Sequence, residues 1–150
     1  MDIFSNMELD HEAIRAQFLK LQNLPTTQHH AREEQLGQLK DALNLHLDTE
    51  EQILYSTLKK VLPQSRLIHE ALEEHKKIRL MLSELAQASI EASNWMGLFN
   101  SLSDLFIRHT LKEEMDLFPQ AWDRLEEATL KNLMHRASDG REIKLSNQLS

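Results

Sequence analysis

The sequence predicts an all-α protein, an antiparallel up-and-down bundle of four long helices with a short fifth helix at the C-terminal end. Gly and Pro number only three each among 150 residues, so few positions interrupt a helix. The remaining residues are mostly good helix formers such as Leu, Glu, Lys, Ala, Gln and Met. Apolar residues recur at spacings of three and four, as in amphipathic helices. A chain of this length is expected to form one domain, over residues 1–150, around one core.

Residues that start and stop helices divide the chain. Pro25 and Pro63 end the first two helices, because proline cannot continue a helix. Ser65 and Asn94 are of the type that caps the next helix. The last helix is expected to stop near Gly140, leaving a polar, partly frayed tail at residues 140–150. The bundle therefore spans about 6–120, and the five expected helices cover about residues 6–24, 30–61, 65–91, 94–119 and 121–136. Short connections imply that neighbouring helices are antiparallel.

The chain contains an internal repeat. Residues 10–21, DHEAIRAQFLKL, align with residues 74–85, EHKKIRLMLSEL, and share His, Ile, Arg and Leu. Residues 46–55, HLDTEEQILY, align with residues 109–118, HTLKEEMDLF, and share His, both glutamates and Leu. Each half thus reads as a helical hairpin with a histidine followed by His-x-x-x-Glu-Glu. Two such hairpins packed about a pseudo-twofold axis would bring both sets to the bundle centre.

Each bundle helix carries a histidine on its apolar face, and two carry a glutamate one turn later on the same face. A lone histidine in such a place is more often a satisfied core residue than a ligand. Burying a polar group without a partner costs roughly 1–3 kcal/mol, however, so six together rival the ~5–15 kcal/mol stability of a whole domain. A bound cation is the natural compensation. The predicted metal ligands are His11, His46, Glu50, His75, His109 and Glu113.

The composition restricts the metal. There is no cysteine, which excludes disulfides, thiolate zinc sites and iron–sulfur clusters. Imidazole and carboxylate suit iron, zinc or manganese. The number of ligands fits two ions, each with two histidines and both bridged by two glutamates. That arrangement leaves room for an oxo or hydroxo bridge and for an open coordination position.

The ordered pattern of four histidines and two glutamates resembles the hemerythrin-like, or HHE cation-binding, domain. The resemblance covers about residues 8–120, and HTLKEEMDLFP, from His109 to Pro119, is similar to the fourth-helix signature of that family. It implies a hemerythrin-like four-helix bundle that holds two iron ions in a carboxylate-bridged, oxo- or hydroxo-bridged centre. It also implies that the protein binds O2, or handles nitric oxide, peroxide or iron itself, for example in sensing or a stress response.

Two departures from the oxygen-carrying hemerythrins follow from the sequence. Those proteins have a fifth histidine one turn from the third-helix histidine, where this chain has Ala71 and Arg79. Their last carboxylate is an Asp five residues after the histidine, whereas this chain has Glu113 at four and Glu114 at five. Repeat symmetry favours Glu113. The missing imidazole argues against simple reversible oxygen carriage. It also leaves both ions with more open coordination positions.

Other readings stay open at this stage. Glu51 and Glu114 either orient ligand imidazoles or are surface glutamates. The repeated Arg15 and Arg79 can simply cover the end of the bundle. Two further functions compete with binding or sensing of O2 and reactive oxygen or nitrogen species. One is a di-iron oxidoreductase acting on peroxide or nitric oxide, or an iron donor for repair, and the other is a metal-free helical interaction module.

Charge and hydropathy exclude several partners. The formal net charge is -7, and no basic face is available to neutralise phosphates, so nucleic acid is not expected to bind. No apolar run approaches the roughly 20 residues that a membrane span needs. The N-terminus carries acidic residues where a signal peptide would be basic and then apolar. We therefore expect a cytoplasmic protein, with any protein partner or homo-oligomer left undetermined.

Overall fold

The computed structural model describes the backbone of residues 2–149 and the side chains of residues 2–140. Every regular element in that part of the chain is helical, which confirms the predicted all-α class. The elements are α1 (Ile3–Gln22), α2 (His29–Thr49), the π-helical η1 (Glu50–Tyr55), α3 (Ser56–Val61), α4 (Arg66–Gln87), α5 (Trp95–Lys112), the π-helical η2 (Glu113–Leu117), α6 (Phe118–Trp122) and α7 (Glu127–Leu149).

Several of these elements join into longer helical stretches. The elements α2, η1 and α3 follow one another without a break over residues 29–61, close to the predicted second helix. In the same way α5, η2 and α6 run continuously over residues 95–122. Pro119 is the second residue of α6, directly after the π-helical segment. Each of the two stretches thus contains a π-helical segment, η1 in the first and η2 in the second.

The helix starts follow from side-chain caps. The Asp2 carboxylate accepts a hydrogen bond from the Ser5 backbone N–H at 3.0 Å, so α1 begins three residues earlier than the predicted start. Ser65 acts as the predicted cap of α4, since its hydroxyl oxygen accepts from the Ile68 N–H at 3.4 Å. The end of α4 lies at Gln87 rather than at the predicted position 91, and a short turn region leads from it to α5.

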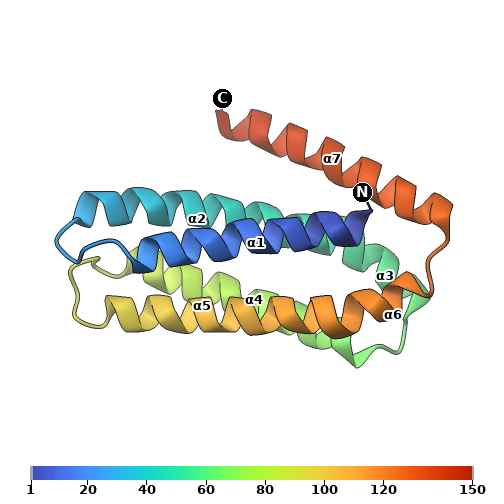
Figure 1. Cartoon of the computed structure of the whole chain (residues 1–150), viewed down its shortest axis with the longest axis horizontal. Coiled ribbons are helices and arrows are strands. Elements are labelled where there is room, and N and C mark those ends of the chain that lie inside the picture. The colour runs from blue at the N-terminus through green and yellow to red at the C-terminus, as the bar shows by residue number, and fades with distance from the viewer. Residues whose placement is uncertain (1, 150) are drawn as a thin grey trace.

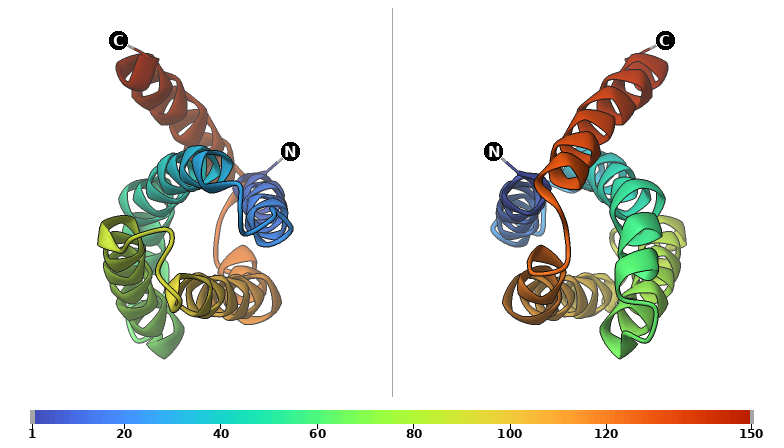
Figure 2. Two further views of the ribbon diagram at one scale, coloured as in Figure 1. Left: turned by 90° about the vertical axis from the view of Figure 1, so that its left-hand side faces the viewer. Right: turned by 90° about the vertical axis from the view of Figure 1, so that its right-hand side faces the viewer.

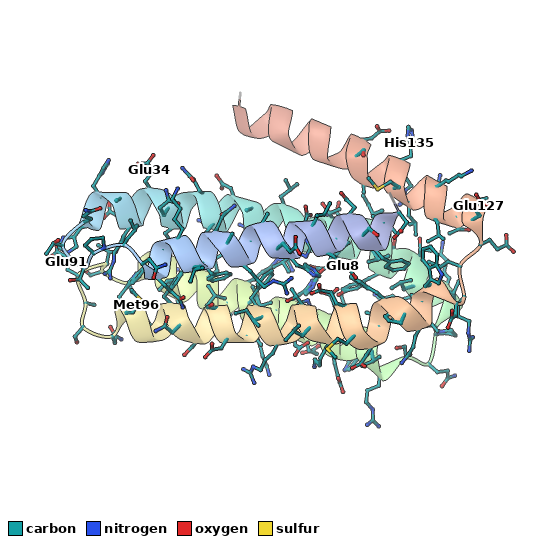
Figure 3. All side chains as sticks on the ribbon, viewed as in Figure 1. Glu8, Glu34, Glu91, Met96, Glu127 and His135 are labelled. Carbon is teal, nitrogen blue, oxygen red and sulfur yellow. The ribbon has the colours of Figure 1, made fainter. Side chains whose placement is uncertain are left out.

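The helices α1, α2, α4 and α5 lie lengthwise beside one another (Figure 1), and seen end-on they surround a common interior (Figure 2). Contacts join α1 to α2 and α5, and α4 to α2 and α5. Side chains fill the space between the ribbons, while Glu34, Glu127 and His135 project outward (Figure 3). None of the helices within residues 2–149 is both long and apolar enough to cross a lipid bilayer.

The C-terminal helix differs from the prediction at both ends. The predicted fifth helix begins at Ala121, but a turn over residues 123–126 separates α6 from α7, which begins at Glu127. It also continues through Gly140 to Leu149, where the sequence predicted a polar tail. A glycine inside a helix costs only about 1 kcal/mol, which one residue among good helix formers can tolerate. The first part of α7 packs on α1 and α2, and its far end diverges from them (Figure 1).

Replacement of Gly140 by alanine is expected to stabilise the protein by roughly 0.5–1 kcal/mol, or about 1–4 °C in Tm. A Cβ atom at this position would lie 3.5 Å from Ile53 Cδ1, which is ordinary van der Waals contact. Thermal unfolding followed by circular dichroism measures the change. Gly37→Ala is the matched control, because a Cβ there meets nothing within 4 Å. A loss of stability confined to the Gly140 variant would contradict the expectation.

The apolar core is divided into two clusters with a polar layer between them. On α1, Met7 belongs to one cluster and Ile14 to the other, with the buried His11 between them. On the stretch from α5 to η2, Phe106 and Leu117 belong to different clusters in the same way. The fold therefore places a slab of polar side chains at one level of the bundle, closed off by hydrocarbon on both sides.

Candidate metal centre

The polar layer contains all six predicted metal ligands. Each of these side chains belongs to a residue that is at most 2% exposed, and they come from α1, α2, η1, α4, α5 and η2. The layer also explains why both halves of the repeat keep a histidine on an otherwise apolar face, because that face forms the centre. The six residues that the structure brings together are His11, His46, Glu50, His75, His109 and Glu113.

The six side chains form two overlapping groups. In one, potential ligand atoms of His11, His46, Glu50 and Glu113 lie within 4.8 Å of one another, and in the other the same holds for Glu50, His75 and His109. Glu50 is the member that both groups share. The geometry therefore fits two neighbouring cations held by nitrogen and oxygen, with Glu50 reaching both.

The histidines of α1 and α4 are oriented from the outside by carboxylates. The His75 Nδ1–H donates to Glu51 at 2.9 Å, and the His11 Nδ1–H donates to Glu114 at 3.3 Å. Of the two readings left open for these glutamates, the structure supports orientation of the imidazoles. The two bonds are equivalent under the repeat, since each joins a histidine of one half to a glutamate of the other.

The repeated arginines hold these same glutamates. Arg79 donates to Glu51 at 2.5 Å, and Arg15 donates to Glu114 at 3.1 Å. Burial raises the pKa of both carboxyl groups, but their histidine and arginine partners outweigh it and the pKa values fall below the ordinary range. The arginines therefore belong to the support of the site and keep the orienting carboxylates ionised.

The histidines of α2 and α5 have carboxylate partners that sequence reasoning missed. The His46 Nδ1–H donates to Asp10 at 3.3 Å, and the His109 Nδ1–H donates to Glu74 at 3.1 Å. Each of these carboxylates directly precedes one of the six residues in the sequence. The available signal was the alignment of Asp10 with Glu74 in the repeat, but acidic residues on helix surfaces are common. All four imidazoles thus have a fixed tautomer, with Nε2 facing the centre.

Several of the atoms that face the centre form no hydrogen bond with the protein. In a neutral imidazole whose Nδ1 carries the proton, Nε2 presents a lone pair. The Nε2 atoms of His75 and His109 lie only 3.0 Å apart, so their lone pairs face each other unless a proton or a cation intervenes. At the centre, the buried atoms without a hydrogen-bond partner are His11 Nε2, His46 Nε2, both carboxylate oxygens of Glu50, and Glu113 Oε1. This set of inward acceptors fits bound cations.

The electrostatics lead to the same conclusion. Burial lowers the pKa of His109, but the charge of Glu113 and hydrogen bonds to carboxylates raise it well above 6.5. Burial raises the pKa of Glu50, but His46 and the other imidazoles around it hold the value well below 4.5. Burial and the charge of Glu50 together raise the pKa of Glu113. The metal-free cluster therefore attracts a proton to His109, and a cation can replace that positive charge.

Both carboxylates of the cluster stand at the start of a π-helical segment. Glu50 begins η1 and Glu113 begins η2. In an α-helix, residues five apart point about 140° away from each other, whereas the i→i+5 bonds of a π turn bring them close to one face. The turn thus brings Tyr55 onto the inner side with Glu50, and it does the same for Phe118 in the other half. Tyr55 is fully buried, and its hydroxyl donates to the Glu113 carboxylate.

The remaining histidines lie outside the centre. His29 pairs with Glu91 on the surface at 3.1 Å, and His135 pairs with Asp139 in the next turn of α7 at 3.1 Å. His30 and His69 are exposed. None of the four contributes to the two groups of potential ligands, in keeping with the absence of a repeat partner for any of them.

Comparisons with known proteins give the family and the fold of the chain. The family model described as the hemerythrin HHE cation binding domain matches residues 2–121. A crystal structure of a hemerythrin HHE cation binding domain-containing protein from Mycobacterium kansasii has the same fold, with a TM-score of 0.86. It shares 21% sequence identity, and the match covers 99% of this chain and 90% of that one. The search of curated proteins finds no match. Since the family model spans most of the chain, the protein belongs to the hemerythrin HHE cation-binding domain family.

Proposed function

We propose that the protein is an antiparallel four-helix bundle that binds two non-haem iron ions through the six buried residues, and that it uses them to bind, sense or respond to O2 or to reactive oxygen and nitrogen species. The observation that carries this proposal is that the two ring nitrogens of each imidazole have different surroundings. Every Nδ1 is held by a carboxylate, while the inward Nε2 atoms converge with the oxygens of Glu50 and Glu113. Such a preorganised set of inward donors is what a metal site requires.

The chemistry of the ligands supports iron without excluding zinc or manganese. Four imidazoles and two carboxylates, with no thiolate, are ligands that iron, zinc and manganese all accept. The group of Glu50, His75 and His109 supplies three protein ligands, fewer than the four of the other group. Three protein ligands leave positions for an exogenous ligand, as in catalytic rather than structural sites. Bound iron would supply redox exchange and a coordination position for a small ligand such as O2, NO or peroxide.

Metal analysis with an optical spectrum tests the proposal. Protein loaded anaerobically with Fe²⁺ and then exposed to air is expected to hold two irons per chain and to show the charge-transfer absorption of a bridged diferric pair. His46→Ala and His109→Ala are expected to lose this absorption, because each removes an inward imidazole. His135→Ala is the matched control, since His135 lies on the surface of α7. A wild-type protein that stays colourless, metal-free and fully stable would instead support a metal-free interaction module.

A second measurement separates binding from turnover. Nitric oxide and peroxide are added to the iron-loaded protein, and their consumption is followed with electrodes. Binding without sustained consumption would support a role in sensing. Consumption over many turnovers would support a di-iron oxidoreductase.

A further inference from the structure

A narrow crevice runs toward the centre between α4 and the stretch from α5 to η2. Its walls include His109 and Glu113, which are at most 1% exposed. They also include Glu74 and Lys112, whose side chains are 17% and 42% exposed. The crevice therefore extends from the surface to two of the six residues of the centre. Its volume is about 10 Å³, close to the space that one water molecule needs.

The space in this crevice comes from a small side chain in its wall. Ala71, one turn before His75, lines the crevice and is 4% exposed. Continued by one turn toward the N-terminus, the alignment of residues 10–21 with residues 74–85 pairs Ala71 with Met7. Met7 is fully buried, and its long thioether side chain fills space that a methyl group leaves open. The two halves of the repeat thus differ in the bulk of the side chain at this place.

The mouth of the crevice carries a flexible cation. The Lys112 ammonium lies 3.0 Å from Glu74 and 3.6 Å from Glu70. Glu74 also accepts the hydrogen bond of the His109 Nδ1–H, so it stays in place when the lysine moves. An ion pair as exposed as this one is weak, and the ammonium can swing into solvent. The repeat pairs Lys112 with Thr49, which is buried and bonds within its own helix, so only the second half has such a cover.

The lining of the crevice restricts what can pass. Besides Ala71, the wall contains the apolar side chains of Leu67 and Leu117. An anion would have to leave its hydration shell to enter such a space, and the two carboxylates at the mouth outnumber the single ammonium. Uncharged molecules about as large as water meet neither obstacle.

We propose, on the basis of the two-cation function above, that this crevice admits an uncharged small molecule, about the size of O2 or NO, to the cation bound by His109. Ala71 determines how large a molecule can pass, and Lys112 covers the mouth. The cation at this position has three protein ligands, Glu50, His75 and His109, and so retains a coordination position for the molecule that enters.

Stopped-flow binding of nitric oxide to the protein loaded anaerobically with Fe²⁺ tests this inference. Ala71→Met introduces the residue that the other half uses at the same place. We expect this variant still to bind two Fe²⁺ per chain, with formation of the iron nitrosyl absorption slowed by at least about tenfold. Ala86→Met is the matched control, because Ala86 is an exposed residue of the same helix, and it should bind NO as fast as the wild type. Ala71→Ser, which keeps the side chain small, should also leave the rate unchanged.

Removal of the cover is expected to have the opposite effect. Lys112→Ala should speed NO binding by about threefold or more, because the mouth then stays open. Lys76→Ala is its control, since it removes another exposed ion pair of α4, that with Glu73, away from the crevice. Equal rates for Lys112→Ala and the wild type would contradict the role of Lys112 as a cover.

Iron content, measured separately from the rates, distinguishes this inference from the proposed function. A wild type that binds fewer than two Fe²⁺ contradicts the two-cation function, and this inference with it. A wild type and an Ala71→Met variant that both bind two Fe²⁺ and take up NO equally fast contradict only the route through the crevice. The same slowing in Ala86→Met or in Ala71→Ser also contradicts it. If Ala71→Met holds fewer than two Fe²⁺, the smaller change Ala71→Val replaces it, and an unchanged rate there overturns the inference.

Discussion

Glu50→Gln is expected to weaken the binding of both cations by more than about 100-fold, beyond the 10–100-fold that loss of an outer hydrogen-bond partner causes. The reason is that Glu50 belongs to both groups of potential ligands. It is also surrounded by imidazoles, with its Oε1 at 3.1 Å from His75 Nε2 and 3.3 Å from His46 Nε2. Glutamine keeps the volume of the side chain and removes the negative charge that both cations need.

Glu113→Gln is expected to have a smaller effect on cation binding. Glu113 belongs to one of the two groups, and one of its oxygens is held by Tyr55. Its other oxygen lies 2.9 Å from His109 Nε2 and 3.6 Å from His11 Nε2, so the variant should weaken both positions, though less than Glu50→Gln does.

Binding isotherms with Fe²⁺ under anaerobic conditions, or with Zn²⁺, measure both variants. Glu12→Gln serves as the control, because Glu12 is an exposed residue next to His11 in the sequence. Equal losses for the Glu50 and Glu113 variants would mean that the two carboxylates share the cations equally. The expected difference between the two carboxylates would then be wrong.

The thermal stability of the metal-free and metal-loaded protein is expected to change with pH in opposite directions. Burial lowers the pKa values of His11 and His75, yet their glutamate partners outweigh it and raise both above 6.5, and His109 is raised further. A group with a raised pKa in the folded state stabilises the fold below its unfolded pKa and loses that contribution as pH rises through the folded value. The metal-free protein should therefore lose stability from about pH 6.5 upward.

The metal-loaded protein should behave in the opposite way. Its imidazoles bind metal only when Nε2 is deprotonated, so protons compete with the cations as pH falls. At a free metal concentration 1,000 times the dissociation constant, each ion adds about 4 kcal/mol to the free energy of unfolding. Two ions then correspond to a rise in Tm of about 15 °C or more at neutral pH. This advantage should shrink toward pH 5.

Differential scanning calorimetry between pH 5 and pH 9, with and without metal, measures both trends. Glu50 does not disturb this window, because its pKa lies well below 4.5 and its contribution is lost only in stronger acid. Parallel curves with and without metal would contradict histidine ligation.

The sequence was sufficient to predict the six central residues for a definite reason. Spacings of three and four placed His46 and Glu50 on one face, and the repeat selected Glu113 over Glu114 as its mate. The first inference depends on helix geometry and the second on the alignment of the two halves, and the structure brings these side chains together. The roles of Asp10 and Glu74 were not predictable in this way, because an acidic residue beside a ligand looks the same whether it faces water or a neighbouring helix.

Two other features were hidden from sequence reasoning. The continuation of α7 through Gly140 depends on a balance of about 1 kcal/mol, which helix propensity alone does not decide. The hydrogen bond of Tyr55 to Glu113 depends on a π turn, for which no residue pattern was available. A regular α-helix would have pointed this side chain away from the face of Glu50.

The π-helical segments limit how this site can be copied into another helical protein. Each begins at a carboxylate of the pair, so every later residue of that helix is rotated relative to an uninterrupted α-helix. A designed scaffold of ideal helices carrying the same six side chains would misplace everything after the carboxylate by about one residue, or 100°. The rings of Tyr55 and Phe118, which pack against His75 and His11, would then face solvent. A working copy must therefore include the extra residue in each helix as well as the ligands.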